Sequence, residues 1–108
     1  MSDAALTVPG FNGGNAMKLV GFEVSSALRL RGGGTGRVAD WSGRFDIEDP
    51  ALARQLGEHL DRTFEEGHTG IAEIIDDDLD GTFRFEGVAV RHRGGVKFAF
   101  DAFLRLRL

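Results

Sequence analysis

The sequence predicts a single α+β domain: a mostly antiparallel five-stranded sheet with one helix packed on one face, in the order ββαβββ. Two stretches in which apolar and polar residues alternate, 18–31 and 96–108, predict strands with one face on a core and one in water. An amphipathic stretch after Asp49 predicts the helix. Because glycine-rich turns join the strands, an antiparallel sheet is favoured.

Residues 96–108 are predicted as one long strand that ends the chain. Its apolar parity contains Val96, Phe98, Phe100, Ala102, Leu104, Leu106 and Leu108. The other parity is mostly charged, with Ala99 and Phe103 as exceptions. A hairpin through the turn at 91–95 is expected to pair it with the strand before it.

Three further strands are expected. The segment 37–47 is predicted as a strand with a bulge near Ala39 and Asp40, because Val38 is out of phase with the residues that follow. The run 71–75 is short and apolar, and 82–90 changes phase at Gly87, which predicts a second bulge. The expected core is Phe22, Val24, Leu28, Leu30, Phe45, Leu56, Leu60, Phe83, Phe98, Phe100, Leu104 and Leu106.

The helix is predicted over about residues 50–65. Asp49 is a typical N-cap residue, and Pro50 suits the first helical position. Apolar residues then recur every four positions, at Leu52, Leu56, Leu60 and Phe64. Residues 1–16, rich in glycine and asparagine, predict a flexible N-terminal arm, which leaves 17–108 as the folded domain.

Composition excludes several classes of protein. The chain of 108 residues has no cysteine, so disulfides and thiolate metal sites are absent. No apolar run approaches the roughly 20 residues of a membrane helix, and the N-terminus lacks a signal peptide, so a cytoplasmic protein is expected. Residues 40–86 carry a net charge of −10, between flanks of +2 and +4. Without a strong basic patch, nucleic-acid binding is not expected.

The acidic segment after residue 75 allows two interpretations. Asp76, Asp78, Asp80 and Gly81 match the first half of a calcium loop, whose second half fails because Gly87 stands where a bidentate glutamate is needed. The other interpretation is an acidic surface turn that meets a basic partner. No cofactor is predicted from the rest of the chain.

Catalytic signals are lacking in this sequence. The three histidines have no zinc-ligand spacing, and no Gly-x-Ser-x-Gly elbow surrounds any serine. The carboxylates lie in solvated runs rather than in pairs with separate environments. A non-enzymatic protein is therefore predicted.

One family is similar in its succession of features. Trp41 is followed by Phe45-Asp46-Ile47-Glu48-Asp49-Pro50, an amphipathic helix and Leu79-Asp80-Gly81-Thr82-Phe83-Arg84-Phe85, and the chain closes on a Phe/Leu-rich strand. This order resembles the small bacterial immunity proteins of the wall-associated toxin type (WapI-like) and related uncharacterised domains. The resemblance implies a non-catalytic inhibitor that binds a partner toxin, and it implies no particular site residues.

The predicted function is a protein-binding module, with an immunity-type inhibitor of a toxin as the specific form. The alternatives are a phage-encoded inhibitor of a host defence complex and a calcium-stabilised structural module. The predicted partner surface is acidic and comprises Asp76, Asp77, Asp78, Asp80, Glu58, Asp61, Glu65 and Glu66. If that surface fails, the next candidates are Arg29, Arg31, Phe103, Arg105 and Arg107.

Overall fold

The computed structural model describes residues 3–30, 37–65 and 72–108. Its strands are β1 (Asp3–Thr7), β2 (Met17–Leu30), β3 (Arg37–Ile47), β4 (Ala72–Asp78), β5 (Gly81–Gly94), β6 (Lys97–Ala102) and β7 (Leu104–Arg107). They are joined by one α-helix, α1 (Pro50–Glu65), and one short 3-10 helix (Asn12–Gly14). No helix among these residues is long and apolar enough to cross a membrane.

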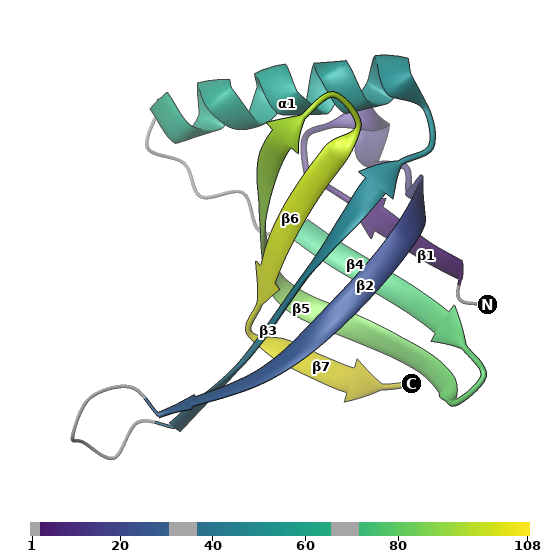
Figure 1. The fold of residues 1–108 in the computed structure, drawn as a ribbon. Coiled ribbons are helices and arrows are strands. Elements are labelled where there is room, and N and C mark those ends of the chain that lie inside the picture. Colours follow the sequence, from purple (N-terminus) through teal and green to yellow (C-terminus); the bar gives the residue numbers. More distant parts are fainter. Residues whose placement is uncertain (1–2, 31–36, 66–71) are drawn as a thin grey trace.

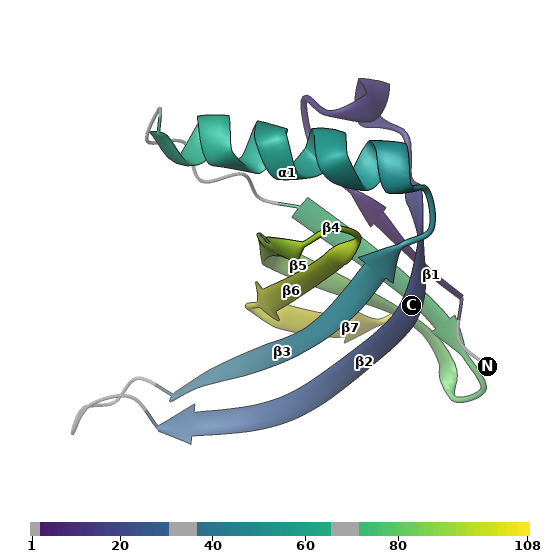
Figure 2. The ribbon, with the colours of Figure 1, turned by 45° about the horizontal axis from the view of Figure 1, so that its top comes forward.

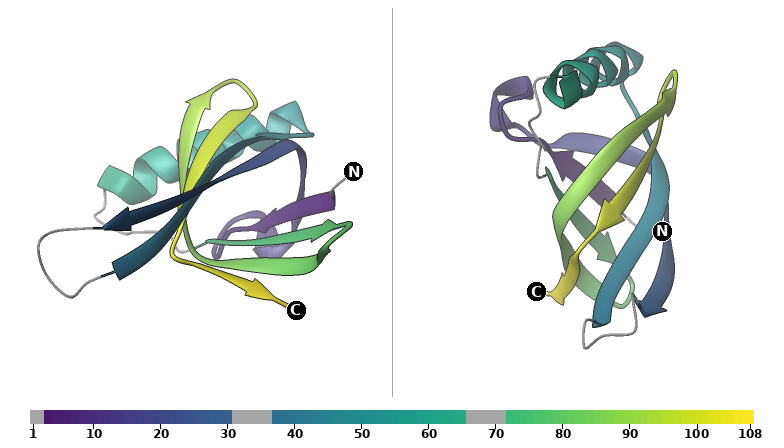
Figure 3. Two further views of the ribbon diagram at one scale, coloured as in Figure 1. Left: turned by 60° about the horizontal axis from the view of Figure 1, so that its bottom comes forward. Right: turned by 90° about the vertical axis from the view of Figure 1, so that its left-hand side faces the viewer.

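The sheet closes on itself as a six-stranded antiparallel barrel, which Figure 3 shows from two sides. The pairing runs β4-β1-β2-β3-β6-β5, and β5 pairs back with β4. The seventh strand, β7, pairs with β5 alone. The predicted open five-stranded sheet is therefore wrong, because two long-range pairings, β1 with β4 and β3 with β6, join its ends.

The first barrel strand lies in the segment that the sequence predicted as an arm. β1 pairs with both β2 and β4 and closes the barrel between them. Ala4, Leu6 and Val8 are buried in the core. Residues 3–8 therefore belong to the folded domain. The sequence did not predict this strand because it is short and its neighbours are polar and rich in glycine.

α1 lies across one end of the barrel instead of covering one face of a sheet (Figures 1 and 2). The predicted start is confirmed: the carboxylate of Asp49 accepts from the backbone N–H of Ala51 at 2.9 Å, and Pro50 is the first helical residue. Ala53 and Leu56 are buried against the barrel, and Leu52 and Leu60 pack beside them. The helix thus seals this end of the core.

Four phenylalanines fill the centre of the barrel: Phe45, Phe85, Phe98 and Phe100. Of the predicted core residues, Phe45, Leu56, Phe98 and Phe100 are buried, and Phe22, Val24, Leu60 and Phe83 are partly buried. The side chains of Leu28 and Leu30 lie outside the described residues. Leu104 and Leu106 are exposed, so their predicted burial is wrong.

A change of phase at Phe103 explains this error. Ala89 pairs with Asp101 and Glu86 with Leu104, so the same number of residues separates these pairs on both strands, and β5 and the β6–β7 segment change phase together. On β5 the change lies at the bulge predicted at Gly87, which the shift in register between β4 and β5 confirms. Beyond Phe103, β7 therefore turns Leu104 and Leu106 outward and places the Arg105 guanidinium over the rings of Phe83 and Phe85.

The bulge predicted near Ala39 and Asp40 lies elsewhere. Pairing of β2 with β3 is continuous from Arg37 to Arg44, and the register shifts on β2 between Val20 and Glu23. Gly21, with a φ of 62°, occupies that shift. The extra residue therefore lies in β2 and not in β3, where the sequence predicted it.

Close packing of α1 on the β5–β6 hairpin depends on Gly57. A Cβ at this position would lie 2.7 Å from Nδ1 of His92. Replacing a helical glycine by alanine ordinarily stabilises a protein by about 1 kcal/mol. We expect Gly57→Ala to give none of this gain in the wild-type protein, and to give it when His92 is also replaced by alanine. Urea unfolding of the double-mutant cycle measures this coupling; equal effects in both backgrounds would contradict the docking of α1 on His92.

Candidate functional site

The predicted acidic surface is divided between the two ends of the barrel. Glu58 and Asp61 are exposed on α1, whereas the turn between β4 and β5 lies at the far end (Figure 1). The side chain of Glu65 and the whole of Glu66 lie outside the described residues. The described helix carboxylates and the acidic turn therefore do not form one surface.

The acidic segment itself alternates across the wall of the barrel. Asp76 points inward, opposite Ala4 of β1 and Phe83 of β5, and is only 4% exposed. Asp77 points outward, where its Oδ1 accepts from the Thr82 hydroxyl at 3.1 Å. A strand places successive side chains on opposite faces. The carboxylates therefore diverge rather than converge on one ligand.

The other two aspartates, Asp78 and Asp80, lie at the turn between β4 and β5. The Oδ1 of Asp78 accepts from the backbone N–H of Asp80 at 2.7 Å, which fixes the β4–β5 turn, and the side chain of Asp80 is exposed. Among residues 3–30, 37–65 and 72–108, no three groups of metal-ligating type gather. The calcium interpretation of Asp76, Asp78 and Asp80 thus finds no converging ligand set in this part of the chain.

Charged groups line the barrel end opposite α1. The Oδ1 of Asp76 has no hydrogen-bond partner within the described structure, nor does Nε of Arg105. The Arg105 guanidinium lies over the ring of Phe83, 3.9 Å from its centroid, and 5.1 Å from that of Trp41. Burial raises the pKa of the Asp76 carboxyl, the negative charge of Asp78 raises it further, and Arg105 opposes both. This end of the barrel therefore holds an incompletely satisfied carboxylate beside a stacked cation.

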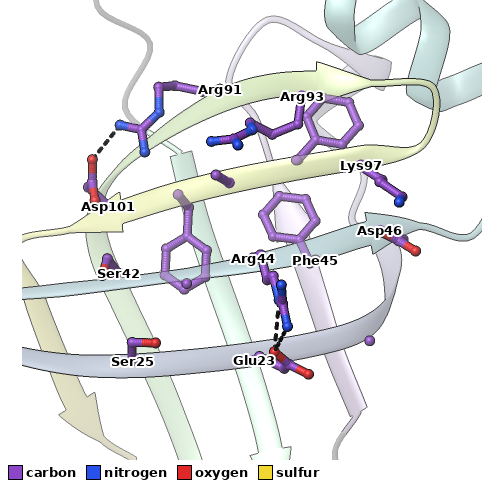
Figure 4. Close-up of a pocket in the computed structure, with 15 residues that line it drawn as sticks. Glu23, Ser25, Ser42, Arg44, Phe45, Asp46, Arg91, Arg93, Lys97 and Asp101 are labelled. Carbon is purple, nitrogen blue, oxygen red and sulfur yellow. Dashed lines mark hydrogen bonds and ion pairs between the residues drawn. The ribbon is translucent and has the colours of Figure 1, made fainter.

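A hollow of about 780 Å³ lies on the outer face of β2, β3, β5 and β6 (Figure 4). Its charges are largely compensated: Arg44 contacts Glu23 at 2.8 Å, and Arg91 contacts Asp101 at 2.6 Å. Among the described residues, Arg93 has no ion-pair partner. Two serines, Ser25 and Ser42, lie among these charged side chains, and no histidine is among the described residues that line the hollow.

The exposed apolar surface is concentrated from Phe103 onward. Phe103 is 56% exposed, Leu104 40%, Leu106 36% and Leu108 60%. We call these four residues the leucine strip. Its first two members also line a hollow of about 510 Å³ together with Thr7, Pro9, Ala72, Glu73, Glu86 and Gly87.

The sequence placed two of the four residues of the leucine strip, Leu104 and Leu106, in the core. Strict alternation over 96–108 predicts burial of Leu104 and Leu106, and only the adjacent apolar pair Phe103-Leu104 signals a change of phase. The secondary candidates Phe103, Arg105 and Arg107 do lie together in and beside β7. The side chains of the other two, Arg29 and Arg31, lie outside the described residues.

Comparisons with known proteins assign no family to this arrangement. The chain matches no family model, no curated protein and no solved structure.

Proposed function

We propose that this chain is a non-catalytic protein-binding module whose partner binds on the leucine strip. The main support is that four large apolar side chains are exposed within six consecutive residues, 103–108. Contiguous exposed apolar surface, especially beside polar residues, is typical of protein-interaction sites. The salt-bridged Arg84 and Glu86 on neighbouring β5 supply such a polar border.

The neighbouring hollow supports the same proposal. Phe103 and Leu104 stand beside Pro9 and Ala72, so the exposed strip continues into an apolar depression. Partner side chains that fill such a depression contribute disproportionately to binding energy. An aromatic or aliphatic side chain of the partner fits this depression best.

The specific form that we propose is an immunity-type inhibitor that binds a toxin in the cytoplasm. Its support is the resemblance described above together with the exposed strip. A phage-encoded inhibitor of a host defence complex is the alternative, since it needs the same kind of surface.

Affinity capture from the organism that encodes the protein tests the proposal. We expect the wild-type chain to retain one stoichiometric partner and Leu104→Glu/Leu106→Glu to lose it, because the substitutions place charge in the interface without emptying the core. Both side chains are exposed, so the fold should persist, as circular dichroism can verify. A toxin or nuclease partner would support the immunity form, and a defence ribonucleoprotein the alternative.

A matched variant distinguishes the two candidate surfaces. Asp77→Asn/Asp80→Asn changes two exposed carboxylates of the acidic segment and leaves the strip intact. We expect this variant to retain the partner. Retention by the leucine variant and loss by the asparagine variant would move the site to the acidic segment, and retention by both would contradict both surfaces.

A further inference from the structure

The strand that carries the leucine strip has a free edge. One edge of β7 pairs with β5 from Leu104 to Arg107, and no strand of the described chain pairs with the other. β7 and the distal half of β3 diverge in two views (Figures 1 and 3). The N–H and C=O groups along that edge therefore have no partner strand among the described residues.

The ladder shows which backbone groups face outward. The backbone N–H of Leu108 donates to the carbonyl of Thr82 at 2.8 Å. Because backbone groups in an antiparallel strand point alternately to the two edges, Leu104 and Leu106 also direct theirs toward β5. The free-edge donors and acceptors then belong to Arg105 and Arg107.

The side chains of these same two residues share one face of the edge. Arg105 pairs across the ladder with inward-facing Phe85, and Arg107 with Phe83. Neither arginine has an ion-pair partner among the described residues. A strand added here would meet two positive charges on one face and the leucine strip on the other.

This pattern disfavours a second copy of the chain as the added strand. Two β7 strands paired antiparallel with leucine opposite leucine would place arginine opposite arginine. Like charges directly opposite one another destabilise a strand pair, and inward charges on an edge are a known protection against self-association. The complementary occupant carries carboxylates where β7 carries arginines.

We infer that the free edge of β7 binds an extended segment of the partner protein by strand addition, with acidic side chains at alternate positions and apolar ones between. The inference rests on the proposed function and specifies how its partner binds. Backbone hydrogen bonds to Arg105 and Arg107 would supply affinity, and the alternating side chains would supply specificity.

Two synthetic peptides test this directly on the full chain. The probes are blocked peptides of about eight residues, one alternating valine with aspartate and one alternating valine with lysine. We expect the aspartate peptide to shift the amide NMR signals of Arg105 and Arg107, and to bind about tenfold more tightly than the lysine peptide. Added salt should reduce this preference. Equal affinities, binding of neither peptide, or shifts confined to the charged hollow of Figure 4 would overturn the inference.

Two substitutions of the exposed Arg107 distinguish the contribution of its backbone N–H to binding from that of its charge. Arg107→Pro removes a free-edge N–H without removing a bond to β5, and edge strands tolerate proline at such positions. It should abolish binding of the aspartate peptide, whereas Arg107→Gln should keep binding and reduce the preference for aspartate. If Arg107→Pro does not fold, the glutamine variant and the two wild-type affinities decide.

The outcome can be separated from that of the proposed function. Loss of the captured partner by Leu104→Glu/Leu106→Glu but not by Arg107→Pro would keep the leucine strip as the site and contradict strand addition. Loss by both supports the two together.

Discussion

Replacing Phe100 by alanine is expected to lower the free energy of unfolding by about 3–5 kcal/mol, the usual cost of emptying an aromatic site in a core. Phe100 is 0% exposed and stacks on Phe22 with ring centroids 5.4 Å apart. It also contacts Phe45 at 6.0 Å and Phe85 at 5.8 Å. The substitution therefore removes the ring that joins side chains of β2, β3 and β5.

The cavity would have little means of collapse. Gly43 faces the same ring: a Cβ there would lie 2.7 Å from Phe100 and would clash with the carbonyl oxygen of Glu23. At Gly43, β3 already approaches β2 as closely as glycine permits. The two strands therefore cannot move inward to fill the cavity left by the Phe100 ring. Equilibrium urea unfolding measures the loss.

Phe103→Ala is the matched control, because the same side chain is removed from an exposed site. We expect a change below about 1 kcal/mol, the usual range for surface substitutions. Similar losses for the two variants would show that Phe100 does not hold the core.

Local signals predicted the elements far better than their assembly. Asp49-Pro50 and the four-residue apolar spacing locate α1 because capping and amphipathicity are properties of neighbouring residues. Closure of the barrel depends instead on pairs such as Ala4 with Asp76 and Phe45 with Phe98, which are far apart in the chain. Nothing in the alternation of one strand specifies its partner.

The candidate site was hidden by the same limitation. Leu104 and Leu106 have the alternation of core residues, and only the joint change of phase at Phe103 and Gly87 turns them outward. Asp76 was assigned to a solvated turn because its neighbours are acidic, although its position in β4 faces the barrel interior. In both cases the side chains lie on the opposite face of the sheet from the one that composition indicated. The reason is that strand register, which tertiary pairing determines, sets this face.

Asp76 provides the second large effect, and its sign is opposite to that of a core deletion. We expect Asp76→Asn to raise the free energy of unfolding at pH 7 by about 1–3 kcal/mol, since a neutral amide avoids the extra desolvation cost of a buried carboxylate. The substitution keeps the size of the side chain and removes a charge that burial disfavours.

The effect should depend on pH in a direction that the pKa determines. Because the folded-state pKa of Asp76 is raised above its unfolded value, the folded protein binds the proton more tightly, and protonation relieves the penalty. The advantage of Asp76→Asn should therefore be full above the folded-state pKa and shrink as the pH falls toward the ordinary aspartate value of about 3.9. Urea unfolding of both proteins from pH 7 to pH 4 measures this difference.

The control is Asp80→Asn, which changes an exposed carboxylate of the same segment and should show no comparable gain in the free energy of unfolding. If the gain for Asp76→Asn is absent at pH 7, or grows as the pH falls, Asp76 is not a buried and poorly satisfied carboxylate.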